Sequence, residues 1–97
     1  MTLTGTDKIE AFGATHSDAR SALERWKGLI RNNRFRNVLE LRKTFGPVDP
    51  VGDYTVFNIR GNNYRLITAV HYDVQRIYVM LFLTHAQYDT DKWKRML

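Results

Sequence analysis

Cysteine is absent from the sequence. A disulfide framework and a thiolate metal site are therefore excluded, and the composition suits a reducing compartment. No apolar run reaches the length of a signal-peptide core or a membrane span, so we expect a soluble, cytoplasmic protein. Linkers, repeats and low-complexity segments are also lacking. The 97 residues are enough for one modest core, so we expect a single domain over residues 1–97.

Acidic residues are few beside the basic ones, with 10 Asp and Glu against 15 Lys and Arg, a net charge of +5. The excess lies in residues 25–43, where seven basic residues and one acid give +6. The seven are Arg25, Lys27, Arg31, Arg34, Arg36, Arg42 and Lys43. Such a block favours a phosphate backbone or an acidic protein partner. A solvated helix face is the alternative, and composition does not decide between them.

The first half of the chain has helical periodicity. Apolar residues recur at helical spacing and predict helices over residues 6–12, 18–32 and 38–45. Gly13 is expected to end the first helix. The third should end before Pro47, since proline cannot continue a helix.

The second half has the composition of a sheet. YTVFNI, YRLITAVHY and RIYVMLFLTH are rich in β-branched and aromatic residues, and short turns at 61–63 and 73–75 separate them. We expect a meander of about three antiparallel strands, with a further short strand at 2–4 and a short C-terminal helix at 91–97. Helices followed by a small antiparallel sheet indicate the α+β class.

Polar residues converge on one end of this predicted sheet. Alternation along the middle strand separates Arg65 from Tyr64, which faces the other way. Counting back from the second turn places Arg65 opposite residue 83 or 84, with His85 just beyond. Arg60 is expected near Tyr64 across the first hairpin. The residues expected to gather there are Arg60, Asn62, Arg65 and His85.

The segment THAQYDTDK extends this cluster if it turns helically. His85, Tyr88 and Lys92 would then share one side, at spacings of i, i+3 and i, i+4. Each residue also has a simpler interpretation. Arg60 and Arg65 suit ordinary hairpin charges, His85 a strand cap and Tyr88 a half-buried aromatic. Only their convergence favours a functional site.

These motifs also carry a family resemblance. FNIRGNNYRL, followed after a strand and a turn by THAQYD, resembles the HigB toxins of type II toxin–antitoxin systems, within the RelE-like group. THSDARSALERWKGLI, with Trp26 in the second helix, and the later ELRKTFG also fit the family's order. The resemblance covers nearly the whole chain. One departure is Asn63, where some members carry Lys or another residue.

The resemblance implies a compact RelE-like toxin. Such a toxin is an mRNA interferase, a hydrolase of the nuclease class that cleaves mRNA, usually on the translating ribosome, and so inhibits translation. It is neutralised by a HigA-like helix-turn-helix antitoxin, through which alone it would reach operator DNA. No metal, cofactor or membrane is implied.

The side chains suggest roles in such an endoribonuclease. Arg65 suits a phosphate clamp, because its planar fork stays charged. His85 suits a general acid or base, and Tyr88 the other partner or an orienting group. The expected RNA contacts are Arg60, Asn62, Lys92, Lys27, Arg31, Arg34 and Arg36.

Two other classes of function compete with this hypothesis. A non-catalytic basic RNA-binding domain would use the same surface and bind in a salt-dependent manner without cleavage. A structural partner protein would use the basic stretch to bind an acidic chain. DNA binding is less favoured, since no helix has the features of a recognition helix.

Overall fold

The computed structural model describes all 97 residues. In chain order the elements are β1 (Thr2–Thr4), α1 (Thr6–Thr15), the 3-10 helix η1 (Ser17–Ala19), α2 (Arg20–Arg31), α3 (Val38–Phe45), β2 (Val48–Val51), β3 (Tyr54–Ile59), β4 (Tyr64–His71), β5 (Arg76–Thr84), α4 (His85–Asp89) and the 3-10 helix η2 (Lys92–Met96). None of the helices has the length and apolar character needed to cross a membrane. The chain is therefore an α+β domain.

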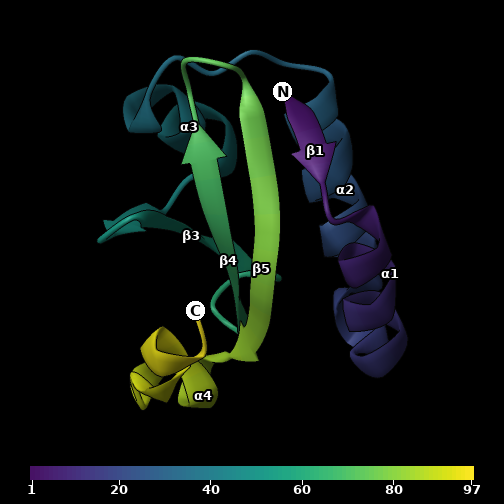
Figure 1. The fold of residues 1–97 in the computed structure, drawn as a ribbon. Coiled ribbons are helices and arrows are strands. Elements are labelled where there is room, and N and C mark those ends of the chain that lie inside the picture. The colour runs from purple at the N-terminus through teal and green to yellow at the C-terminus, as the bar shows by residue number, and fades with distance from the viewer.

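The five strands form one sheet in the order β1-β5-β4-β3-β2. β1 runs parallel to β5, and the other neighbours are antiparallel. Figure 1 shows α1 and α2 side by side along one side of the sheet, with α3 at one end of the strands and α4 at the other. The C-terminus lies beside α4 (Figure 1). The two ends of the sheet are thus covered by different parts of the chain.

The main core lies between the sheet and the helices. α2 buries Leu23, Trp26 and Ile30 along one stripe, and these pack with Phe57 of β3 and Leu66 of β4. Removal of this apolar surface from water is the main driving force for folding. We call this side of the sheet the helix-covered face.

The opposite side, which we call the open face, has a smaller cluster. Val56 and Ile67 are buried there beneath Trp93 of η2, and Tyr88 of α4 packs against them. Arg65 also faces this side, two residues before Ile67 on β4, and lies under Tyr88. The short C-terminal segment is therefore what covers the open face.

The predicted helices are confirmed, with corrected ends. α3 begins as predicted after Asn37, whose side chain accepts a hydrogen bond from the backbone N–H of Glu40 at 3.0 Å. The prediction that Gly13 ends the first helix is wrong, because α1 continues to Thr15. Gly13 is buried within this helix against Arg20, and a Cβ there would meet that side chain at an ordinary contact distance of 3.6 Å.

The meander and its register are also confirmed. Arg65 lies opposite Leu83, one of the two predicted partners, although the β4–β5 register shifts by one residue between Ile67 and Thr68. β1 adds a short strand at the edge. One strand was not predicted: β2 pairs with β3 although it contains Pro50. Proline lacks the N–H that a central strand needs, but β2 is the last strand of the sheet, where one side of the strand is free.

Candidate active site

Arg65 is the most enclosed of the predicted site residues, with 9% of its surface exposed. Its Nη1 donates to the backbone oxygens of Asn62 and Tyr64, both at 3.1 Å. Its Nη2 donates to the side-chain oxygen of Asn62. These bonds hold the guanidinium against the β3–β4 turn and leave part of its donor capacity unused. Asn62 is therefore a positioning residue for Arg65.

No carboxylate neutralises Arg65. The ion pairs of the structure join other residues. Its guanidinium carbon lies 5.6 Å from the centre of the Tyr88 ring, within cation–π distance. Tyr88 in turn stacks on Trp93, with ring centres 5.3 Å apart. A largely buried cation with only neutral partners leaves a positive potential that favours an anion.

The surroundings of Tyr88 favour the protonated form of its phenol. Burial is the main cause that raises the pKa of its phenol above the ordinary value. The charge of Asp49 raises this pKa further, while Arg65 and Lys94 oppose the shift. The hydroxyl is therefore protonated at neutral pH, and it can give a proton but is a poor base.

His85 reaches the same end of the sheet, as predicted. It is the first residue of α4, and Thr84 caps that helix. The backbone N–H of His85 donates to the Asn63 oxygen at 3.0 Å, which fixes the start of α4 against the turn that holds Arg65. Its Nε2 lies 3.2 Å from Oδ2 of Asp89, and 43% of its side chain is exposed. The imidazole is thus both oriented and accessible.

Arg60 lies near Tyr64 across the first hairpin, as predicted, but the expectation that its side chain joins the Arg65 cluster is wrong. Its Nη1 lies 3.3 Å from Oδ2 of Asp18 in η1. The hydroxyl of Tyr64 donates to the same carboxylate, at 2.8 and 3.0 Å from its two oxygens. Asp18 belongs to the helix layer, so Arg60 reaches the helix-covered face whereas Arg65 lies on the open face. A left-handed φ of 52° at Arg60 belongs to the turn between them.

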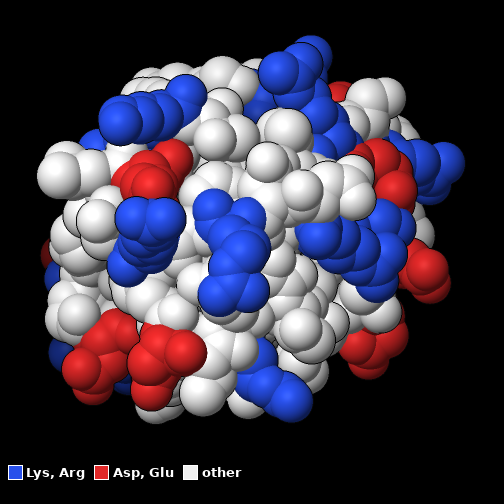
Figure 2. Space-filling view, turned by 90° about the horizontal axis from the view of Figure 1, so that it is seen from above, with Lys and Arg blue, Asp and Glu red and all other residues white.

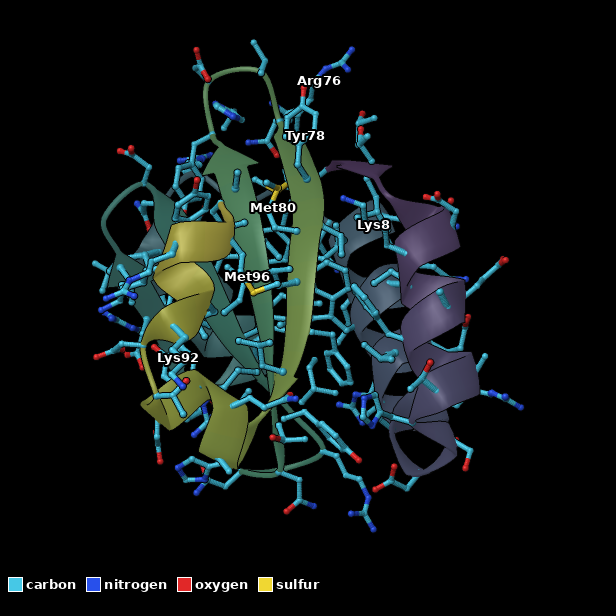
Figure 3. The ribbon with its side chains drawn as sticks, turned by 60° about the horizontal axis from the view of Figure 1, so that its bottom comes forward. Lys8, Arg76, Tyr78, Met80, Lys92 and Met96 are labelled. Atoms are coloured by element: carbon cyan, nitrogen blue, oxygen red, sulfur yellow. The ribbon has the colours of Figure 1, made fainter.

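Lys92 is also displaced from its expected position. α4 ends at Asp89, and Asp91 adopts a left-handed φ of 60° before η2 begins. Lys92 therefore does not continue the side of α4 that carries His85, contrary to the predicted helical spacing. Figure 3 shows Lys92 on the C-terminal segment. Lys94 contacts the cluster instead: its Nζ lies 5.7 Å from the centre of the Trp93 ring, and its charge acts on the Tyr88 phenol.

The basic stretch lies largely away from Arg65. Arg34 and Arg36 belong to the segment between α2 and α3, which Gln75 ties down by donating to the Phe35 oxygen at 2.7 Å. Gln75 lies in the β4–β5 turn, at the opposite end of β4 from Arg65. At about 3.3 Å per residue, these two ends of the strand are about 20 Å apart.

The remaining basic residues do not form one continuous patch at that end. Figure 2 shows it from above, with Lys and Arg side chains separated by uncharged surface and by Asp and Glu. Lys27 pairs with Glu24 at 2.9 Å, and Arg31 ends α2. The basic stretch is therefore spread over surface away from the sheet-end cluster, and its predicted contacts with RNA stay a prediction.

Two residues that act on Tyr88 were missed in the sequence. Trp93 is buried to 2% exposure, completes the stack with Tyr88 and donates from Nε1 to the Tyr88 oxygen at 3.1 Å. Asp49 lies on β2 opposite Val56 and acts on the Tyr88 phenol. The sequence did contain a sign of the role of Trp93. It is a large aromatic residue within a charged C-terminal segment, and such a side chain usually packs against an apolar surface. No cluster of three or more His, Cys, Asp or Glu side chains is arranged to hold a metal ion.

A small mixed sheet with a helical layer on one face and this polar cluster on the other defines an α+β protein of the RelE-like class. Residues 19–91 match the family model of HigB toxins, described as the RelE-like toxic component of a toxin–antitoxin system. The chain therefore belongs to the HigB toxin family, and an antitoxin is its partner. No curated protein is similar enough to the chain to count as a relative.

Proposed function

We propose that this toxin is an endoribonuclease, an mRNA interferase that cleaves mRNA at the open face and so inhibits translation. The observation that carries the proposal is Arg65, a nearly buried cation held only by neutral partners beside the start of α4. A phosphate supplies the missing negative charge, and the guanidinium fork suits two phosphate oxygens. Family membership supports the same class of target.

In the proposed step, the ribose 2′-oxygen attacks the adjacent phosphorus and the bond from phosphorus to the 5′-oxygen breaks. His85 takes the proton of the 2′-hydroxyl, and Tyr88 gives its phenolic proton to the leaving 5′-oxygen. Arg65 stabilises the charge that develops on the phosphate oxygens. The products are a 2′,3′-cyclic phosphate and a 5′-hydroxyl. His85 then releases its proton to solvent and Tyr88 takes one up from solvent, which restores both groups.

The division of roles follows from the surroundings of the two groups. His85 is accessible, and Asp89 at its Nε2 leaves the other ring nitrogen free to accept a proton. Tyr88 has a raised pKa and is held by Trp93, which suits a donor. General acid and base groups each contribute about 10²–10⁴-fold to such reactions.

RNA is held near the site by few groups in this proposal. Asn62 and Lys94 flank the Arg65 stack, and Lys92 adds a solvent-exposed charge. Stacking of RNA bases on Tyr64 is not supported, because that ring is buried against Phe82 at 4.9 Å. The predicted contacts in the basic stretch would reach mRNA or ribosomal RNA only at a distance from the cleavage point. These residues are Lys27, Arg31, Arg34 and Arg36. A ribosome as the carrier of the mRNA fits such widely spaced contacts.

The antitoxin in this proposal is a HigA-like helix-turn-helix protein, and the toxin acts in the cytoplasm. Expression of the toxin alone should arrest growth, and coexpression of the antitoxin encoded beside it should restore growth. Arg65→Ala and His85→Ala should each relieve the arrest while the circular dichroism spectrum is unchanged. The proposed site is wrong if both variants accumulate, fold and arrest growth like the wild type.

A non-catalytic basic RNA-binding domain remains the second candidate, because Arg34, Arg36 and their neighbours are exposed. It predicts salt-dependent RNA binding that Arg65→Ala leaves nearly unchanged and no cleavage under any condition. Incubation of the purified toxin with translating ribosomes, followed by mapping of mRNA ends, separates the two candidates.

A further inference from the structure

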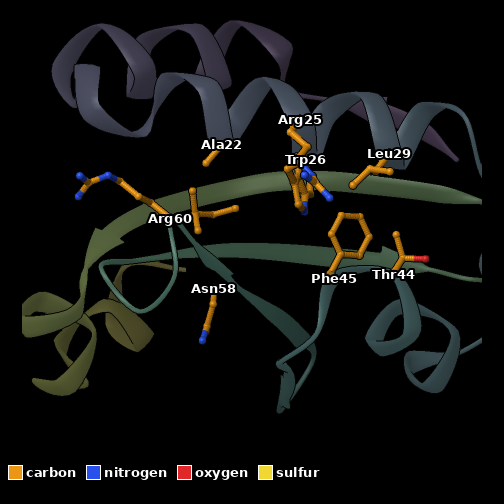
Figure 4. Close-up of a pocket in the computed structure, with 9 residues that line it drawn as sticks. Ala22, Arg25, Trp26, Leu29, Thr44, Phe45, Asn58 and Arg60 are labelled. Carbon is orange, nitrogen blue, oxygen red and sulfur yellow. The ribbon is translucent and has the colours of Figure 1, made fainter.

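A hollow of the molecule lies on the helix-covered face, away from the stack of Arg65, Tyr88 and Trp93. It is a cavity of about 260 Å³ between α2, the end of α3 and the end of β3. Figure 4 shows Ala22, Arg25, Trp26 and Leu29 entering it from α2, with Phe45 across from them. We call it the α2–α3 pocket. Its volume is below the range of about 300–1,000 Å³ that is usual for small-molecule sites, and it suits one inserted side chain.

The floor of the α2–α3 pocket is aromatic. Trp26 meets Phe57 edge to face with ring centres 5.4 Å apart, and Phe45 meets the same ring at 5.1 Å. These rings are fixed by the core beneath them, since Trp26 and Phe57 are 2% and 0% exposed. A preformed apolar hollow of this kind favours a rigid apolar anchor from a partner.

A buried donor without a partner also belongs to this pocket. The Nε1 of Trp26 is the one buried side-chain nitrogen or oxygen in the structure that makes no hydrogen bond. Buried tryptophan N–H groups usually find an acceptor, so an unsatisfied one calls for an explanation. A carbonyl or carboxylate oxygen carried by a ligand would supply the acceptor that the free protein lacks.

The rim of the pocket is positive. Arg25 is exposed and makes no ion pair, while Arg60 shares the carboxylate of Asp18. No acidic residue lines the pocket. An apolar floor under an unpaired guanidinium fits a side chain such as Leu, Ile or Phe that is followed closely by Asp or Glu.

We infer that the α2–α3 pocket is a docking site for the antitoxin, which inserts an apolar side chain and places a neighbouring carboxylate on Arg25. The antitoxin is the partner that family membership requires, and the inference does not depend on the proposed chemistry at Arg65. The pocket and Arg65 lie on opposite faces of the sheet. Docking here therefore requires no contact with the Arg65 stack, and the β3–β4 turn is the segment that both sites share.

The first test is a pair of charge reversals on α2. Arg25→Glu removes the rim charge, and Arg31→Glu makes the same change at an exposed position of the same helix that does not line the pocket. Isothermal titration with the antitoxin encoded beside the toxin should show at least about a tenfold loss of affinity for Arg25→Glu. Arg31→Glu should bind the antitoxin with an affinity within about threefold of the wild type, because Arg31 is a surface charge outside the rim of the pocket. Equal affinity of the two variants would overturn the inference.

The second test locates the anchor. Overlapping peptides that cover the antitoxin are added to ¹⁵N-labelled toxin, and the indole N–H signals of its two tryptophans are followed. A peptide with an apolar residue beside an acid should shift the Trp26 signal and leave that of Trp93 in place. A shift of Trp93 alone, or of neither while the whole antitoxin binds, would contradict the inference.

The third test fills the hollow. Ala22→Phe occupies space at the pocket wall, and retention of growth arrest by the variant shows that it folds. Coexpressed antitoxin should then fail to restore growth, whereas full rescue would overturn the inference. Both binding tests omit RNA, so a toxin that binds its antitoxin as inferred but cleaves no RNA would refute the proposed function alone.

Discussion

Tyr64 and Arg65 are neighbours in the chain, yet their side chains enter two regions of opposite character. On the helix-covered face, the hydroxyl of Tyr64 and the guanidinium of Arg60 share the carboxylate of Asp18. On the open face, Arg65 has two backbone carbonyls, an amide and an aromatic ring around it, but no carboxylate.

The difference separates an arginine that is paired with a carboxylate from one that is not. Both arginines come from the same hairpin, and charge alone does not distinguish them. Arg60 is half exposed and already paired with Asp18, so its charge is largely neutralised and attracts an anionic ligand only weakly. Arg65 is nearly buried and has no carboxylate partner. This arrangement costs stability in the free protein, but it favours the binding of an anion. A strand that alternates between two faces can thus serve the core and the site with adjacent residues.

The largest expected effect contrasts the packing of the two faces. Leu66→Ala removes a leucine with 0% exposure from the main core and should lower the free energy of unfolding by about 2–5 kcal/mol. Leu83→Ala makes the same change at a half-buried position on the open face and should lower the free energy of unfolding by clearly less than Leu66→Ala does. Urea unfolding followed by circular dichroism measures both. Equal losses would show that the open face is packed as firmly as the other.

The next effect contrasts the two arginines. Arg65→Ala should lower the rate of RNA cleavage by about 10²–10³-fold, the loss expected when a donor to the developing charge is removed. Arg60→Ala should change the rate by less than about threefold, because its partner is an exposed carboxylate. Single-turnover cleavage on programmed ribosomes gives both rates. If Arg60→Ala were the more damaged variant, the assignment of the two faces would be reversed.

The smallest effect concerns Tyr64 at alkaline pH. Its hydrogen bond to Asp18 is the main cause that raises the pKa of the phenol above the ordinary value of about 10. The folded state therefore holds this proton more tightly than the unfolded state. The stabilisation is complete below about pH 10 and is lost as the pH rises through the folded-state pKa.

Tyr64→Phe should reduce that alkaline loss of stability and leave RNA cleavage at neutral pH unchanged. Tyr88→Phe is the matched variant on the open face, and it should impair cleavage. The urea midpoint between pH 8 and pH 11 measures the first effect. An unaltered pH profile in Tyr64→Phe would show that the bond to Asp18 does not stabilise the fold.

Much of the fold was predictable because a short turn joins β4 to β5. Counting back from that turn narrows the partner of Arg65 to residue 83 or 84, but the register shift between Ile67 and Thr68, which sets the pairing with Leu83, has no signal in the sequence. β2 was not predictable in this way. Pro50 disfavours a strand in the sequence, and it is tolerated only because β2 lies at the edge of the sheet.

The site was predictable in part for the same reason. His85 follows a strand of known register, and its position beside the turn could be inferred. The pairing of Arg60 with Asp18 joins residues 42 positions apart on different elements, and no local pattern indicates it. The break at Asp91 depends on a left-handed residue that is not glycine, which hid both the displacement of Lys92 and the stack of Trp93 on Tyr88.

The chemical nature of the RNA ends tests the central claim most directly. mRNA recovered from translating ribosomes after incubation with the purified toxin should carry new 5′-hydroxyl ends paired with 2′,3′-cyclic phosphates or their hydrolysed 3′-phosphates. These ends should be nearly absent with Arg65→Ala. New ends that carry 5′-phosphates, or mRNA that stays intact while translation stops, would contradict cleavage by side-chain chemistry at the open face.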